Sequence, residues 1–169
     1  MRMRALSSFF LLAFLASGGV AHAQEDGECP AGSPTTLVKG IISAVGEKPI
    51  WVAVGRDPLV WKGEGEAQTV MWIRDLEATG AIMLSGTNTE TGAAMQFAAN
   101  NTALPRPEKF RLDARGTMPR GDVSQDDLRA YTFHPSAVWF PSAGCYQINA
   151  QIGREQAVLH LEIVEPSEP

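Results

Sequence analysis

Histidine, cysteine and clustered basic residues are all scarce in this sequence, and each scarcity argues against a class of function. Of the three histidines and two cysteines, His22 falls in the expected signal peptide and the cysteines are expected to pair with each other, which leaves fewer than the three or four nitrogen or sulfur ligands that a zinc site needs. The formal net charge of −5 argues against nucleic-acid binding, because phosphate contacts require clustered Lys and Arg. The sequence has neither a Cys-x-x-Cys pair nor a Gly-x-Ser-x-Gly segment. We therefore expect a protein with no catalytic activity and no cofactor.

Long apolar runs are also scarce, and the longest lies at the N-terminus. Arg2 and Arg4 precede an apolar stretch that reaches Val20, and Ala21-His22-Ala23 then places small residues where a signal peptidase reads. We interpret residues 1–23 as a cleaved signal peptide, since a retained membrane anchor would need about 20 strongly apolar residues. Cleavage leaves 146 residues with a formal charge of −7. We expect the mature protein to be periplasmic or secreted, with no membrane span.

The two cysteines, Cys29 and Cys145, lie near opposite ends of the mature chain. Export favours a disulfide, because disulfides persist in oxidising compartments. The two ends of a small domain can come within the ~5.5 Å Cα separation that the bond needs. We predict a Cys29–Cys145 bridge, and the alternatives are two buried free thiols or a redox or metal-binding pair.

Short segments rich in Val, Ile, Trp, Phe and Thr recur along the mature chain and are separated by Gly, Pro, Asn and Asp. This pattern predicts an all-β fold. The last two segments alternate apolar and polar residues on either side of Gly153, which is typical of a β-hairpin with one wet face. One short helix is expected at 124–131. The predicted strands are 37–43, 50–55, 59–62, 69–74, 80–86, 93–98, 109–112, 137–140, 145–152 and 157–164.

The most distinctive segment is Phe140-Pro141-Ser142-Ala143-Gly144-Cys145-Tyr146. It resembles the Phe-Pro-x-x-Gly-Cys-aromatic signature of a group of mostly uncharacterised bacterial exported proteins. That group also tends to carry a Cys-Pro pair after the signal peptide, matched here by Cys29-Pro30, and it usually has Trp where this chain has Tyr146. The resemblance implies an immunoglobulin-like β-sandwich and supports the disulfide, but it implies no activity.

The residues and the resemblance together predict one folded domain. We expect an all-β, immunoglobulin-like, two-sheet antiparallel β-sandwich over residues 37–164, with at most one or two short helical turns. Residues 24–36 then form an N-terminal segment that carries Cys29, and residues 165–169 form a tail. The expected role is a non-catalytic binding or structural module with a protein or glycan partner.

Two groups of residues suggest alternative functions. A carbohydrate-binding module would use an exposed tryptophan as a platform, and Trp61 is the candidate, although core packing is the alternative for every tryptophan and clearest for Trp72. Asp122, Asp126 and Asp127 could bind Ca²⁺ or serve a hydrolytic enzyme. A solvated loop that leads into a helical turn explains these acidic residues equally well.

Overall fold

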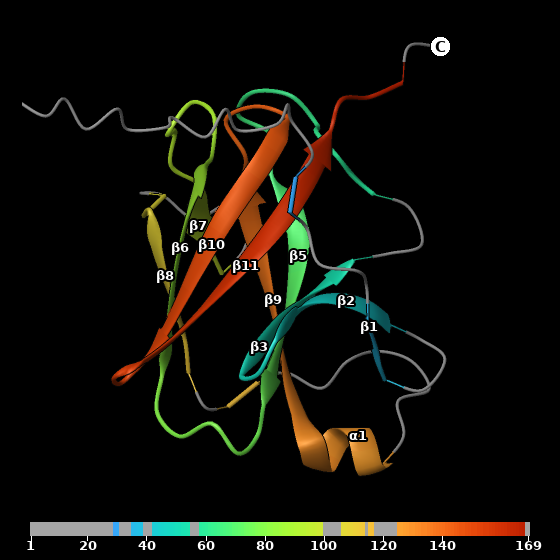
Figure 1. Ribbon diagram of the computed structural model, residues 1–169, viewed down its shortest axis with the longest axis vertical. Coiled ribbons are helices and arrows are strands. Elements are labelled where there is room, and N and C mark those ends of the chain that lie inside the picture. Colours follow the sequence, from blue (N-terminus) through green and yellow to red (C-terminus); the bar gives the residue numbers. More distant parts are fainter. Residues whose placement is uncertain are drawn as a thin grey trace, which may run out of the picture.

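The computed structural model describes residues 29–30, 35–38, 42–54, 58–99, 106–113, 115–116 and 125–167. These residues form strands in two facing sheets, with one short helix at the end opposite the β9–β10 connection (Figure 1). The elements are β1 (Thr35–Val38), β2 (Ile42–Glu47), β3 (Ile50–Val54), β4 (Leu59–Val60), β5 (Gln68–Asp75), β6 (Ile82–Asn88), β7 (Gln96–Ala98), β8 (Lys109–Leu112), α1 (Gln125–Ala130), β9 (Tyr131–Trp139), β10 (Gly144–Ile152) and β11 (Glu155–Val164).

The order of the strands is that of an immunoglobulin-like sandwich. The six-stranded sheet has the order β1-β2-β3-β5-β9-β7, and the five-stranded sheet has the order β4-β11-β10-β6-β8. By pairing, β3, β5, β9 and β7 take the places of strands A, B, E and D, while β6, β10 and β11 take those of C, F and G. The predicted two-sheet sandwich is therefore confirmed. It is not antiparallel throughout, because β4 crosses to the other sheet and runs parallel to β11.

The final hairpin shows why alternation identified its strands. In β10 the side chains of Tyr146, Ile148, Ala150 and Ile152 are buried, and the residues between them face outward. β10 and β11 pair from Gly144 opposite Ile163 to Ile152 opposite Glu155, which leaves a two-residue turn. A strand with one face in the core must alternate in this way, because successive side chains point to opposite faces.

The main core fills the space between the two sheets, and a second cluster lies on the outer face of the six-stranded sheet. Alternate residues of β5 enter the two clusters, with Trp72 in the main core and Ile73 in the outer one. The six-stranded sheet is therefore apolar on both faces, which explains the nearly continuous apolar run of β5. The outer cluster contains Ala44, Trp51, Ile73 and Phe133.

The predicted strand 37–43 is wrong. β1 ends at Val38 and β2 begins at Ile42, and the two strands pair antiparallel with Thr36 opposite Ser43. The chain therefore reverses between them, and Gly40 stands between them in the sequence as a turn signal.

The predicted strand 137–140 begins six residues earlier in the structure, at Tyr131, and contains Pro135. A proline has no N–H to donate and is normally confined to a strand edge. Pro135 pairs with Met71 of β5 on one side. On the other side β7 pairs with residues 137–139 of β9, so the β7–β9 ladder does not need an N–H from Pro135.

The predicted signal peptide, residues 1–23, lies outside the described residues. Of the N-terminal segment 24–36, the structure describes Cys29, Pro30, Thr35 and Thr36. In the part of the chain that the structure describes, no helix is long and apolar enough to cross a membrane.

Candidate functional site

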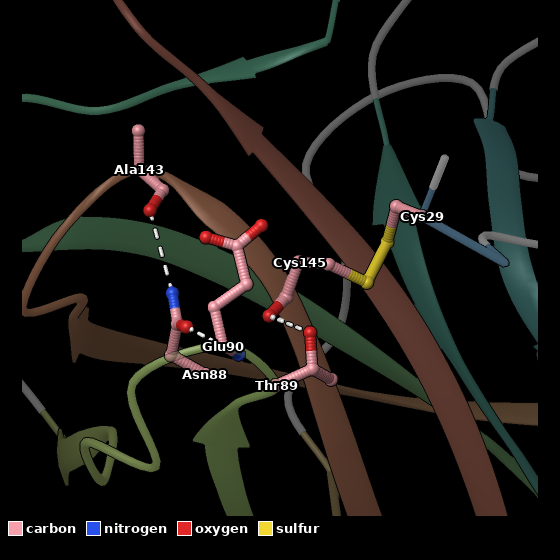
Figure 2. Close-up of a disulfide and its surroundings, with 6 residues drawn as sticks. All are labelled: Cys29, Asn88, Thr89, Glu90, Ala143 and Cys145. Carbon is pink, nitrogen blue, oxygen red and sulfur yellow. Dashed lines mark hydrogen bonds between the residues drawn. A yellow bond between two sulfur atoms is a disulfide. The ribbon is translucent and has the colours of Figure 1, made fainter. Parts of the chain in front are cut away.

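The disulfide joins the N-terminal segment to the start of β10. The sulfur atoms of Cys29 and Cys145 are 2.07 Å apart and their Cα atoms are 5.3 Å apart, in the pairing expected from the sequence (Figure 2). The bond links positions 116 residues apart. Both cysteines are bridged, so the structure does not contain the two free thiols of one alternative.

Asn88, the last residue of β6, holds the neighbouring loops together beside the disulfide (Figure 2). Its amide nitrogen donates to the carbonyl of Ala143 at 3.3 Å, and its Oδ1 accepts the backbone N–H of Glu90 at 2.9 Å. The backbone N–H of Thr89 donates to the carbonyl of Cys145 at 2.8 Å. Asn88 is buried, so these bonds fix the β6–β7 loop against the β9–β10 corner.

The β9–β10 corner is fixed from within by Gly144 and Tyr146. Gly144 has a φ of +126°, and a Cβ there would lie 2.9 Å from Nδ2 of Asn88, so the corner requires glycine. The Tyr146 hydroxyl donates to the carbonyl of Ser142 at 2.7 Å and accepts the N–H of the same residue at 3.2 Å. A tyrosine bonded back to this corner is a hallmark of immunoglobulin sandwiches. The corner positions Phe140 for the site described next.

A hollow of about 240 Å³ opens beside this corner, and we call it the Trp139 hollow. The last residue of β9 supplies an aromatic ring, and the β4–β5 connection, β7 and the segment before β8 supply the remaining walls. Its charged or amide side chains are Glu64, Gln96 and Arg106. The lining residues are Glu64, Gly65, Ala94, Gln96, Arg106, Trp139, Phe140 and Pro141.

Strand pairing and a hydrogen bond fix the ring of Trp139. Gln96 lies directly opposite Trp139 in the β7–β9 ladder, so the two side chains are neighbours on the outer face of the six-stranded sheet. The indole nitrogen donates to the carbonyl of Gly65 at 3.1 Å. Ala98 and Ala137 pack with the ring. The aromatic wall is therefore part of the rigid sheet.

Arg106 covers this ring. Its Cζ lies 4.3 Å from the centre of the Trp139 ring, which is a cation–π contact. The neighbouring residue Pro107 accepts the backbone N–H of Phe97 at 2.9 Å, which anchors this segment against β7. The Nε of Arg106 is buried and has no hydrogen-bond partner in the described structure. A buried donor without an acceptor costs about 1–3 kcal/mol, so the guanidinium is incompletely satisfied.

Trp61, the predicted sugar platform, lies next to this hollow without lining it. Its ring is partly buried against the main core, and its indole nitrogen donates to the carbonyl of Phe140 at 3.1 Å. Trp51, Trp72 and Trp139 are buried. Trp61 thus supports the wall of the Trp139 hollow from behind, and Trp139 provides the ring that lines it.

The structure does not bring the three predicted calcium ligands into a described site. Asp122 lies outside the described residues. Asp126 and Asp127 belong to α1, and the Asp126 side chain is 94% exposed and lies 3.8 Å from Arg129 in an ion pair along the helix. Among the described residues, no group of three or more His, Cys, Asp or Glu side chains could hold a metal ion.

A larger hollow, of about 390 Å³, lies at the opposite end of the sandwich beside α1, and we call it the Lys48 hollow. Lys48 bonds to Asp75 at 2.9 Å and to Glu77 at 3.3 Å, and these two carboxylates raise the pKa of the lysine, Asp75 through the larger effect. Arg129 on its other wall pairs with Asp126. Each cation of the Lys48 hollow therefore has a protein carboxylate as its partner, whereas no described carboxylate forms an ion pair with the guanidinium in the Trp139 hollow.

Two buried polar side chains, those of Arg74 and His134, lie on the inner face of the six-stranded sheet near α1. Arg74 of β5 is 2% exposed and donates to the carbonyls of Ala78 and Gly80. His134 of β9 is also buried, and its Nε2 lies 3.0 Å from the hydroxyl of Thr132. Burial, and secondarily the charge of Arg74, lowers the pKa of His134. Ser136, two residues along β9, accepts a hydrogen bond from the indole nitrogen of Trp72 at 2.7 Å.

We expect the His134→Gln variant to lose part of the protein's acid sensitivity. The folded-state pKa of His134 lies below its value of ~6.5 in the unfolded chain. As pH falls through 6.5 the unfolded chain binds the proton first, so the free energy of unfolding decreases until the pH passes the folded-state pKa. Urea unfolding at pH 7.5 and pH 5 should show a smaller loss for His134→Gln than for the wild type. Equal losses would contradict this role of His134.

Comparison with known proteins adds little to this geometry. No family model matches the chain, and no curated protein matches it. Among solved structures, the chain is similar to one described as a "Putative Lipoprotein from Bacillus anthracis", with 14% sequence identity and a TM-score of 0.49. That match covers 80% of this chain and 88% of the other.

Proposed function

We propose that this protein is an exported, non-catalytic sugar-binding module whose ligand occupies the Trp139 hollow. The observation that carries the proposal is the combination of an aromatic ring with a carboxylate, an amide and a guanidinium around one hollow. A sugar offers hydroxyl groups to such polar side chains, and the buried Trp139 ring holds the guanidinium of Arg106 over it. The polar groups present are hydrogen-bonding groups for a ligand and do not include a nucleophile paired with its base.

The size and rigidity of the hollow also support a small polar ligand. Its volume of about 240 Å³ is below the ~300–1,000 Å³ of pockets that enclose a drug-sized molecule. It therefore suits one or two rings of a longer glycan. Trp139 and Gln96 lie on paired strands, and sites built on such elements hold their geometry better than loops do. Export is supported by the basic and apolar N-terminus and by the disulfide.

We expect the purified exported protein to bind at least one polysaccharide from a soluble panel, and the Gln96→Ala variant to bind it about 5- to 10-fold more weakly. Tryptophan fluorescence and isothermal titration would measure the affinity. Gln151→Ala is the matched control, because Gln151 is an exposed amide on the outer face of the other sheet. Failure to bind any glycan, or equal binding by Gln96→Ala and the wild type, would refute the proposed site.

A further inference from the structure

We infer that the ligand of the Trp139 hollow is an acidic saccharide whose carboxylate is bound by Arg106. This inference rests on the proposed function and names the class of sugar. A uronic acid carries a planar carboxylate on a sugar ring, so it can use both the guanidinium and the hydrogen-bonding groups around it. The reasons lie in the position of Arg106, in its missing partner and in the charges of the neighbouring hollow.

Arg106 is positioned so that its guanidinium can bind a carboxylate through two hydrogen bonds. The planar group lies over the Trp139 ring with its Cζ 4.3 Å from the ring centre. Stacking on an aromatic face restricts the guanidinium while leaving its N–H edge available for in-plane hydrogen bonds. Carboxylates bind such an edge through two parallel N–H···O bonds, and these charge-assisted bonds are about twice as strong as neutral ones.

The missing partner indicates that this arrangement is incomplete in the free protein. Arg106 Nε is buried and has no acceptor in the described structure. Arg106 also forms no ion pair with any described carboxylate, although Glu64 lines the same hollow. A carboxylate that enters the hollow can accept from Nε and from a terminal nitrogen in the plane of the guanidinium, which stays over the Trp139 ring. Glu64 is exposed at the rim and remains available to sugar hydroxyls.

In the Lys48 hollow of the same molecule, both cations have protein carboxylates as partners. There Lys48 has carboxylates at 2.9 Å and 3.3 Å, and Arg129 has one at 3.8 Å. A ligand carboxylate would have to compete with those protein carboxylates. In the Trp139 hollow it would meet a cation that no described protein carboxylate neutralises. An anionic ligand is therefore favoured at Trp139 and disfavoured at Lys48.

The experiment compares polygalacturonate with its methyl-esterified form, which has the same sugar backbone without the free carboxylate. Titration of the purified exported protein at pH 7 should show at least 10-fold tighter binding of the acidic polymer. Arg106→Gln should weaken the acidic polymer about 10- to 100-fold and leave the ester nearly unchanged. Arg106→Lys should also lose most of the preference, because lysine keeps the charge but lacks the planar fork.

Arg154→Gln is the matched control, because Arg154 is exposed in the β10–β11 turn, and it should bind like the wild type. Equal affinity for both polymers, or binding of a neutral glycan alone, would overturn the acidic class while leaving the proposed function intact. Binding of neither polymer nor any other glycan would overturn the proposed function itself. Full competition by millimolar acetate would show a simple carboxylate site and would also overturn the inference.

Discussion

Replacing Cys29 and Cys145 together by alanine should lower the free energy of unfolding by about 4–5 kcal/mol. The bridge closes a loop between positions 116 residues apart, and the chain-entropy model gives about 4.7 kcal/mol for a loop of about 100 residues. The folded state should change little around Cys145, because Thr89 bonds to its backbone carbonyl and not to its side chain. Most of the loss should therefore come from a less restricted unfolded chain. Urea unfolding followed by tryptophan fluorescence would measure it.

The single variants provide the decisive control for the disulfide. Cys29→Ala and Cys145→Ala each remove the whole bridge, so each should lose nearly as much stability as the double variant. Wild-type protein unfolded in the presence of a reductant should behave like all three. A single variant that loses less than about 1 kcal/mol would show that the bridge does not constrain the unfolded chain in the way the entropy model requires.

The strands that the sequence predicted well are those whose two faces differ. In β10 and β11 one face is buried and the other is wet, so alternation is visible in the residues themselves. The strand predicted at 109–112 also has its predicted bounds. The prediction of strand bounds failed where a residue that usually interrupts strands lies inside one. A proline concealed the first half of β9, which tolerates Pro135 because β7 pairs with residues 137–139 and with no described residue earlier in β9.

The candidate site was harder to predict because its parts are distant in the sequence. Core packing was the alternative for every tryptophan in the sequence, and Trp139, at the end of β9, is indeed buried. Arg106 comes from the proline-rich connection before β8, and only the folded chain brings it over that ring. A residue between Pro105 and Pro107 is held extended, so the sequence did contain a sign of order there. It contained no sign of which aromatic ring the arginine would meet.

Trp61 is a second residue whose environment its sequence neighbours did not predict correctly. Glycines and charged residues follow it in the sequence, which suggested exposure. In the structure its indole nitrogen bonds to the carbonyl of Phe140 and its ring packs on the main core. Local composition indicates the environment of a segment, whereas the burial of a ring depends on the strand that packs against it.

Replacing Trp72 by alanine should lower the free energy of unfolding by about 3–5 kcal/mol, the usual cost of emptying the volume of a buried large aromatic side chain. Trp72 is fully buried in β5, which lies between β3 and β9. Its ring is tilted against Phe97 at 6.3 Å, and Phe97 stacks on Phe110 at 5.9 Å. Because Phe97 and Phe110 belong to different sheets, this row of rings joins the two layers. Chemical unfolding of the variant would measure the loss.

A double-mutant cycle with Ser136 separates the hydrogen bond of Trp72 from its packing. The indole nitrogen donates to the Ser136 hydroxyl at 2.7 Å, and Ser136 is buried. Trp72→Phe leaves the Ser136 hydroxyl without this donor, and Ser136→Ala leaves the indole N–H without this acceptor. Each single variant should therefore lose about 1–3 kcal/mol of unfolding free energy for the buried polar group that has lost its partner. The double variant leaves neither group without a partner. Its loss of unfolding free energy should therefore be smaller than the sum of the two single losses by about 1–2 kcal/mol. Strict additivity would mean that the two side chains are not coupled and that packing alone accounts for the burial of Trp72.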